Sequence, residues 1–207
     1  MLPLLHNSTF KNISIGMGLF RLVKRGCQDL WDKLCNHKWR SIICALVAIA
    51  GIVVGVVLLK VFRYGWWYNN RCDYALRLFE GGFSLFFFFL LWTAVFYLCV
   101  VGCSVVPQTK FLLYTLLFVA CLYCGANTAA AIVCWSVWGV LYTILVTLFE
   151  VVGYYLATLV ACCEPTSCRN FKESLCDTKQ SLAVLAVAFF VKIICYFVIL
   201  RILTAVI

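Results

Sequence analysis

Long apolar stretches alternate with short polar connections along most of the chain. From Ser41 onward, runs of Val, Ile, Leu, Phe and Ala dominate, and the polar segments between them are short. Ser41–Leu59 carries no charge, and a helix over it is about 28 Å long, close to the roughly 30 Å of a hydrocarbon core. The pattern predicts an all-α protein, a polytopic transmembrane helical bundle.

The segment Phe111–Ala161 is too long for one membrane crossing. Glu150 is its single charge, and one helix over the segment would reach about 76 Å. We expect it to fold back at Gly125-Ala126-Asn127-Thr128, where Gly and Asn favour a turn. The bundle, residues 41–207, then has about five spans, with four as the alternative. The predicted spans lie near residues 41–60, 83–106, 111–125, 129–161 and 182–207.

Two local patterns add detail to this map. Gly51 and Gly55 form a G-x-x-x-G motif, which permits close contact between helices in a membrane. Residues 60–82 are predicted to form a polar connection, and its cluster of Trp66, Trp67 and two tyrosines is typical of the membrane interface.

Residues 1–40 form a basic arm that precedes the first span. Apolar residues recur every three or four positions over residues 15–36, while charged residues fill the other face. This spacing predicts an amphipathic helix that lies in the membrane interface. Packing of the same helix on a partner protein is the alternative. The apolar face consists of Phe20, Val23, Cys27, Leu30, Trp31 and Leu34.

Charge sets the expected orientation and partners of the arm. The chain has 17 Lys and Arg against 8 Asp and Glu, and seven of the basic residues precede the first span. Basic residues near spans favour the cytoplasmic side, so we expect a cytoplasmic (or virion-interior) N-terminus and a lumenal or exterior C-terminus. The arm is expected to contact anionic lipid headgroups, with phosphates of a nucleic acid as the other interpretation. The contact residues are Arg21, Lys24, Arg25, Lys33, Lys38 and Arg40.

Composition narrows the class of function. Apolar residues make up 65% of the chain and charged residues 12%, against about 45–50% and 25% in soluble domains. This composition excludes a water-soluble globular enzyme and a disordered chain. No hydrolase, P-loop, dinucleotide or metalloprotease motif is present in the sequence. We therefore expect a non-enzymatic protein without cofactor or metal.

Three ionisable side chains fall within predicted spans. Glu150 and Lys192 lie at similar distances before and after the late polar loop, so an antiparallel hairpin brings them to the same depth. We expect a Glu150–Lys192 ion pair that fixes helix packing, because an isolated charge in a bilayer is costly. A proton or ion pathway, or a neutral Glu150, are the alternatives. Arg201 is near enough to the helix end to reach the interface.

Most of the 14 cysteines lie in apolar runs, where a thiol acts as a small apolar side chain. The late loop, residues 162–181, carries the densest polar-side group. Facing the cytosol, these cysteines suit acylation, and facing an oxidising compartment they suit disulfides. They are Cys162, Cys163, Cys168 and Cys176.

The layout resembles that of the small virion membrane proteins of negeviruses and kitaviruses. The matching features are the basic arm from Arg21 to Arg40 and the hydrophobic spans from Ser41 onward. The resemblance implies a matrix-like protein that self-associates in a viral envelope or host endomembrane. It also implies contact with an envelope glycoprotein and, through the arm, with viral RNA.

Two other functions fit the same pattern. One is a cellular membrane organiser of the tetraspan type, although Glu164 follows Cys162-Cys163 where tetraspanins have glycine. The other is a small ion channel or viroporin with Glu150 and Lys192 lining its pore. A scaffold should assemble without conducting, whereas a channel should pass current that changes on Glu150→Gln.

Overall fold

The computed structural model describes residues 34–63, 65–79, 83–105 and 109–163, together with single positions near both ends. These residues are almost entirely helical. The all-α prediction is therefore confirmed for this part of the chain. The elements are α2 (Lys38–Val61), α3 (Trp66–Phe79), α4 (Phe83–Val105), α5 (Lys110–Trp135), α6 (Val137–Tyr142), the π-helical turn η2 (Thr143–Thr147) and α7 (Leu148–Cys163).

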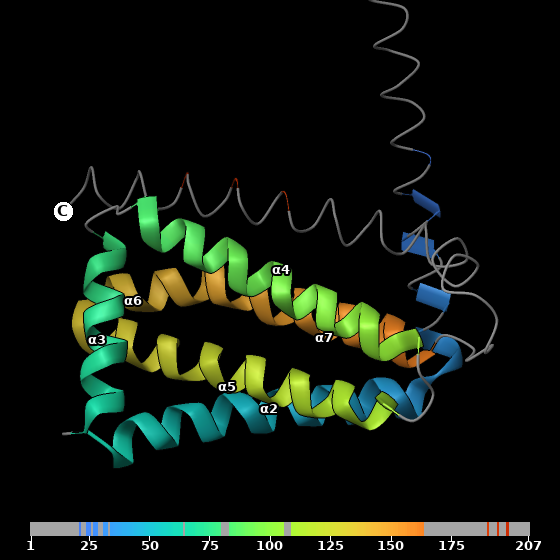
Figure 1. The fold of residues 1–207 in the computed structure, drawn as a ribbon, viewed down its shortest axis with the longest axis horizontal. Helices are drawn as coiled ribbons and strands as arrows, with labels where there is room; N and C mark the ends of the chain where they lie inside the picture. Colours follow the sequence, from blue (N-terminus) through green and yellow to red (C-terminus); the bar gives the residue numbers. More distant parts are fainter. Residues whose placement is uncertain are drawn as a thin grey trace, which may run out of the picture.

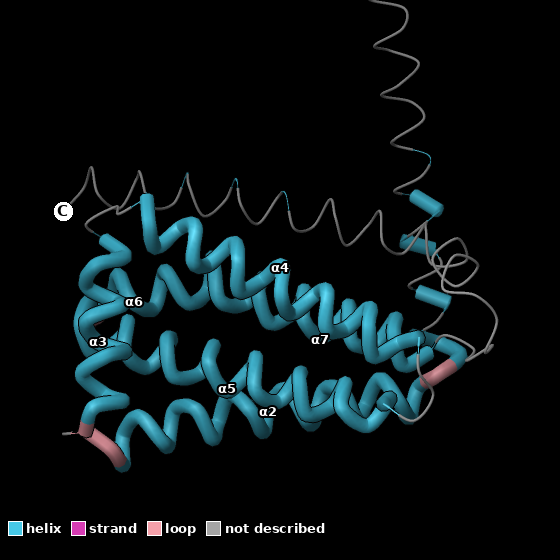
Figure 2. The backbone as a smooth tube through the Cα atoms, viewed as in Figure 1, coloured by secondary structure: helices cyan, strands magenta, loops and turns pink. Residues whose placement is uncertain are grey.

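The long helices lie side by side, and α3 crosses them at one end (Figures 1 and 2). α2 and α5 run in one direction, while α4 and the continuous α6–η2–α7 helix run in the other. α5 is central, because it contacts every other helix among the described elements. We call the end where α2 and α5 begin and α7 finishes the basic end, and the opposite end the α3 end.

Three helices are long and apolar enough to cross a membrane. They are α2, α5 and the continuous helix Val137–Cys163. α4 is a helix of 23 residues whose described side chains form a shorter apolar stretch, Leu91–Ser104. The fifth predicted span, 182–207, lies outside the described residues apart from isolated positions. A polytopic membrane protein is thus supported, and the count of five spans stays a prediction.

The G-x-x-x-G motif of α2 is a contact surface for α5, as predicted. A Cβ added at Gly51 would lie 2.6 Å from the carbonyl oxygen of Phe118, and one at Gly55 would overlap the Leu122 carbonyl. Gly125 of α5 packs in turn on the backbone of Ile52. The two backbones therefore approach so closely that only glycine fits at these positions.

The turn predicted at Gly125–Thr128 is wrong, because α5 continues through it to Trp135. Gly125 serves helix packing there, and the neighbouring Ala126 is fully buried. The break occurs at Ser136, whose φ of 52° and ψ of −117° reverse the chain between α5 and α6. In apolar surroundings an unbroken helix keeps its backbone hydrogen bonds satisfied, so glycine in a span favours contact over a turn.

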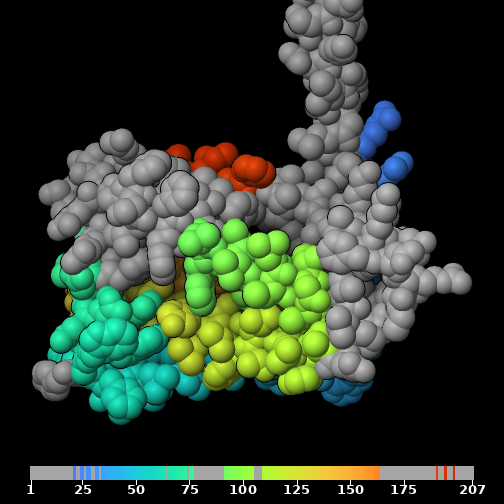
Figure 3. Space-filling view, viewed as in Figure 1, coloured from blue at the N-terminus to red at the C-terminus, as the bar shows by residue number. Residues whose placement is uncertain are grey.

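The predicted polar connection 60–82 contains a helix that sequence analysis missed. The chain turns at Phe62–Gly65, where Gly65 N–H donates to the Phe62 carbonyl at 2.9 Å, and α3 follows. α3 packs on the ends of α2 and α5, where Ala75 meets Leu59 and Ala130. In the space-filling view α3 fills one end of the face that α4 and α5 also form (Figure 3).

Candidate functional site

A polar cluster lies between α4 and α7 in the interior of the bundle. Glu150 stands in the first turn of α7, and one turn later the Tyr154 hydroxyl donates to its Oε1 at 2.8 Å. Tyr154 is 1% exposed. Glu150 is half-buried, and removing a carboxyl group from water is costly unless hydrogen bonds satisfy it, of which Tyr154 supplies one.

α4 contributes two further hydroxyl groups to this cluster. The buried Thr93 side chain hydrogen-bonds Tyr154, and the Tyr97 hydroxyl reaches α7 at Gly153, which lies three residues after Glu150. The Tyr97 hydroxyl is 3.2 Å from where a Cβ would stand on Gly153, so glycine leaves room for it. The ring of Phe96 packs on Tyr154 with 4.3 Å between ring centroids. Hydroxyl groups of α4 and the carboxyl group of α7 thus meet inside one interface.

A π-helical turn precedes the cluster. η2 spans Thr143–Thr147, and the Thr143 hydroxyl donates to the Gly139 carbonyl at 2.8 Å. A π turn inserts one extra residue, which rotates every later side chain around the helix axis, and such turns are frequent at functional sites. The rotation sets which face of α7 carries Glu150.

The same face of α7 continues polar toward the basic end. Tyr154, Thr158 and Cys162 follow Glu150 at intervals of four residues, and all three are buried. The Thr158 hydroxyl makes no hydrogen bond to any described residue. A buried hydroxyl of this kind is a place where membrane proteins hold water or a ligand.

The predicted ion pair has one member in the described part of the chain. Lys192 lies outside the described residues, so the Glu150–Lys192 pair stays a prediction. What the structure assigns to Glu150 is the Tyr154 hydroxyl, a partner that sequence analysis missed. The spacing of four residues within α7 was the available signal, because such pairs meet on one helix face.

The basic end joins the start of α2 to the end of α7. Arg40 donates from Nη1 to the Cys162 carbonyl at 2.7 Å, where the negative end of the α7 dipole favours a cation. The hydroxyls of Ser41 and Tyr155 are also hydrogen-bonded, at 2.5 Å. Arg40, predicted to contact headgroups or nucleic acid, therefore also holds two helices together.

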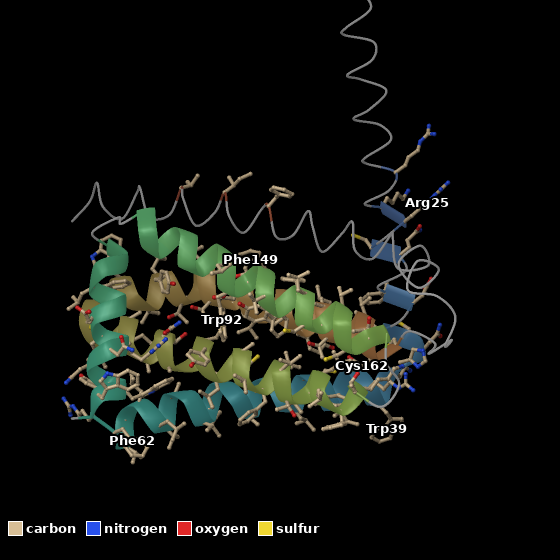
Figure 4. The ribbon with its side chains drawn as sticks, in the orientation of Figure 1. Arg25, Trp39, Phe62, Trp92, Phe149 and Cys162 are labelled. Atoms are coloured by element: carbon tan, nitrogen blue, oxygen red, sulfur yellow. The ribbon has the colours of Figure 1, made fainter. Side chains whose placement is uncertain are left out.

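The remaining predicted arm residues are exposed where they are described. Arg21, Lys24, Arg25 and Lys38 are exposed, and Lys33 lies outside the described residues. Figure 4 places Arg25 and Trp39 near the same end as Cys162, with Phe62 at the opposite end. The amphipathic helix over 15–36 is described only at isolated positions and stays a prediction.

Four cysteines were predicted to lie in a late loop over residues 162–181, and for two of them this prediction is wrong. Cys162 and Cys163 lie in the last turn of α7 and are buried thiols outside any disulfide, 3% and 8% exposed. Their apolar neighbours carry α7 further than expected, since Ala, Val and Leu precede them without a helix breaker. Burial makes these two thiols poor acylation substrates. Cys168 and Cys176 lie outside the described residues.

An aromatic cluster with one cation occupies the α3 end. The Arg71 guanidinium carbon lies 4.8 Å from the Trp67 ring centroid and 5.1 Å from that of Tyr123. Arg71 Nη1 donates to Oδ1 of Asn127 at 3.3 Å, and Trp92 packs on Tyr123. This cation–π arrangement fastens α3 to α5. Sequence analysis missed it because α3 was predicted as a connection.

No group of three or more metal-ligating side chains occurs in the described ranges. Comparisons with protein-family models, curated proteins and solved structures yield no match to this chain. Inferences about function therefore depend on the residues and contacts described above.

Proposed function

We propose that the protein is a structural, multi-pass membrane protein that associates laterally with further copies and organises a bilayer. The observation that carries this proposal is an apolar ridge along α2, on the side away from its glycine contact with α5. The ridge is exposed along the whole helix, and its side chains are between 48% and 61% exposed. They are Ile42, Leu46, Ile49, Val53 and Val57.

The ridge suits association because it is both apolar and rigid. The side chains recur at intervals of four and three residues, which is the spacing of one helix face. β-branched residues have few side-chain conformations, so packing a second helix against them costs little conformational entropy. Gly51 and Gly55 anchor the opposite face of α2 to α5 and thereby hold the ridge in a fixed orientation.

The basic arm supplies the contact with one leaflet. Lys38 and Arg40 stand at the end where α5 also begins with Lys110, while Lys60 and Arg63 stand near the α3 end. With the Lys and Arg excess cytoplasmic, the arm binds anionic headgroups on that side. A peptide of residues 15–36 should bind anionic vesicles and lose binding in high salt. Equal binding to neutral vesicles would contradict the electrostatic part.

The setting we propose is a viral envelope or host endomembrane, with a matrix-like role. Its support is the layout of basic arm followed by hydrophobic spans. In that setting the arm faces the virion interior, where it meets viral RNA, and an envelope glycoprotein is a lateral partner. Recovery of the protein from purified enveloped particles, and its absence from particle-free membranes, is the expected observation.

The ridge is tested by bulky substitutions in liposomes. The double variant Ile49→Trp, Val53→Trp should lower fluorescence resonance energy transfer between dye-labelled copies of the protein at least severalfold. The large indole rings prevent close contact between α2 helices of two copies. Val133→Trp is the matched control, since Val133 is 57% exposed on α5 outside the ridge. Equal energy transfer in both variants would reject the ridge as the association surface.

The channel remains a second candidate because of the polar cluster between α4 and α7. Glu150 offers a protonatable carboxyl group at mid-span, and the hydroxyls of Tyr154 and Thr93 extend it as a hydrogen-bonded chain. Proteoliposomes distinguish the two functions: a scaffold passes no current, while a channel passes a current that falls with Glu150→Gln. If the Glu150→Gln variant passes the same current, ions cross the membrane by a path that does not include Glu150.

A further inference from the structure

Two cysteines distant in the sequence meet at the α3 end. Cys72 of α3 and Cys134 of α5 pack in one cluster, and the Cys134 thiol donates to the Cys72 carbonyl oxygen at 3.9 Å. Both are half-buried thiols outside any disulfide, Cys72 in the middle of α3 and Cys134 in the last turn of α5.

A second pair of cysteines meets at the basic end. Cys44 of α2 and Cys162 of α7 pack in the same buried core cluster. These two side chains are 0% and 3% exposed. The bundle thus carries one thiol pair at each end, and the two pairs differ in exposure.

The two ends of a membrane bundle face compartments of different redox potential. Disulfides form in the lumen and outside the cell, and thiols persist in the cytosol. We propose that Cys72 and Cys134 form a disulfide that ties α3 to α5, while Cys44 and Cys162 remain thiols. The choice of compartment depends on the proposed orientation, in which the α3 end is lumenal or exterior.

The geometry favours bond formation. A disulfide requires two cysteines whose backbones lie close together, and the Cys134 Sγ already lies 3.9 Å from the Cys72 backbone carbonyl oxygen. Tyr68 packs in the same cluster as Cys72 and Cys134. Cys134 stands one residue before the end of α5, so the bond would form at the boundary of the bundle and not at mid-membrane.

The oxidant is a small disulfide, such as oxidised glutathione, or the disulfide form of a thiol oxidoreductase. The Cys72 thiolate attacks one sulfur of the oxidant, forming a mixed disulfide and releasing one oxidant thiolate. The Cys134 thiolate then attacks the Cys72 sulfur, forming the Cys72–Cys134 bond and releasing the second thiolate. The two protons lost by the cysteines go to these thiolates. Two electrons pass from the cysteines to the oxidant.

The bond would add a covalent attachment to the non-covalent contacts that hold α3. α3 is held by the small apolar cluster of Leu59, Ala75 and Ala130 and by the stacking of Arg71 on Trp67 and Tyr123. A covalent link to α5 holds the outer, aromatic-rich face of α3 at one depth. The exposed Trp66 then stays at the interface.

The first experiment uses the purified full-length protein in detergent with oxidised glutathione. Free thiols are blocked with a maleimide, and chymotryptic peptides are analysed by mass spectrometry before and after reduction. We expect a Cys72–Cys134 peptide pair in most molecules, with Cys44 and Cys162 alkylated after denaturation. Cys134→Ser should abolish the pair and distinguish Cys134 from Cys124 in the same peptide, whereas Cys35→Ser should leave it unchanged.

The second experiment asks which pair forms in cells. Thiols are blocked in intact cells before lysis, and the same peptides are quantified. A Cys72–Cys134 bond with free Cys44 and Cys162 is the expected result. The proposal is overturned if Cys72 and Cys134 are both alkylated after glutathione treatment, or if cells link Cys44 to Cys162 and leave the α3 pair free.

Discussion

The α2–α5 and α4–α7 interfaces hold helices together in different ways. Between α2 and α5, glycines bring two backbones into direct contact. Between α4 and α7, large side chains meet, and Thr93, Tyr154 and Glu150 form hydrogen bonds. Lipid tails provide no hydrophobic force that drives helices together, so packing and polar contacts must do so. The first interface depends on shape and the second on hydrogen bonds.

The difference predicts how each interface responds to mutation. Where a glycine packs directly on the backbone of the neighbouring helix, an added side-chain atom cannot fit, because backbone atoms cannot rotate away as a side chain can. A hydrogen-bonded cluster loses only the bond that is removed, because its side chains can still pack. The following substitutions test this contrast, from the largest expected effect to the smallest.

Gly55→Leu should have the largest effect. The new side chain would overlap the Leu122 carbonyl, and the bundle should lose about 3 kcal/mol or more of stability. Gly102→Leu is the matched control, because a Cβ there meets nothing within 4 Å. Thermal unfolding in detergent compares the two. A Gly55→Leu protein as stable as Gly102→Leu would mean that α2 and α5 are not in backbone contact.

Tyr154→Phe should have a smaller effect. The ring still packs on Phe96, while Glu150 and Thr93 lose a shared partner, which should cost about 1–2 kcal/mol. A double-mutant cycle with Thr93→Val measures the coupling. Phe149→Leu, at a side chain that is 55% exposed, serves as the control. Additive effects of Tyr154→Phe and Thr93→Val would show that the two hydroxyls act independently.

Ser136→Gly should raise stability. Ser136 joins the helix of the first interface to that of the second, and its φ of 52° is a conformation that glycine adopts without a steric penalty. The expected gain is about 1 kcal/mol, measured as a higher midpoint of thermal unfolding. Ser136→Val should have the opposite sign. A destabilised glycine variant would contradict the position of the break between α5 and α6.

Arg40→Ala should have the smallest effect of the four. It removes the donor to the Cys162 carbonyl at the exposed basic end, and about 0.5–1 kcal/mol should be lost. Lys38→Ala removes an exposed arm charge of the same sign and should leave stability nearly unchanged. If Arg40→Ala and Lys38→Ala have the same midpoint of thermal unfolding, the hydrogen bond from Arg40 to the Cys162 carbonyl adds nothing beyond a positive charge.

Much of the fold followed from local pattern, and much of the candidate site did not. The apolar runs predicted α2 and the extent of α4, and Gly51 with Gly55 predicted a helix contact. The turn at Gly125 was misplaced because the same residue favours a turn in water and close packing in a bundle. α3 was missed because its apolar residues are mixed with polar and charged ones. Ala75 is recognised as part of a packing face only once its partners at the ends of α2 and α5 are known.

The sequence by itself determined that the chain forms apolar helices with an excess of basic residues in its N-terminal arm. These properties depend on composition and on spacing within single segments, so neighbouring helices do not alter them. The tertiary structure decided that Tyr154 meets both Glu150 and Thr93, that Arg40 binds the last turn of α7, and that Cys134 meets Cys72. Three of these contacts join residues on different helices, and the π turn before α7 sets the face that carries Glu150. Such contacts depend on helix rotation and depth in the bundle, which the spacing of residues along one helix does not specify.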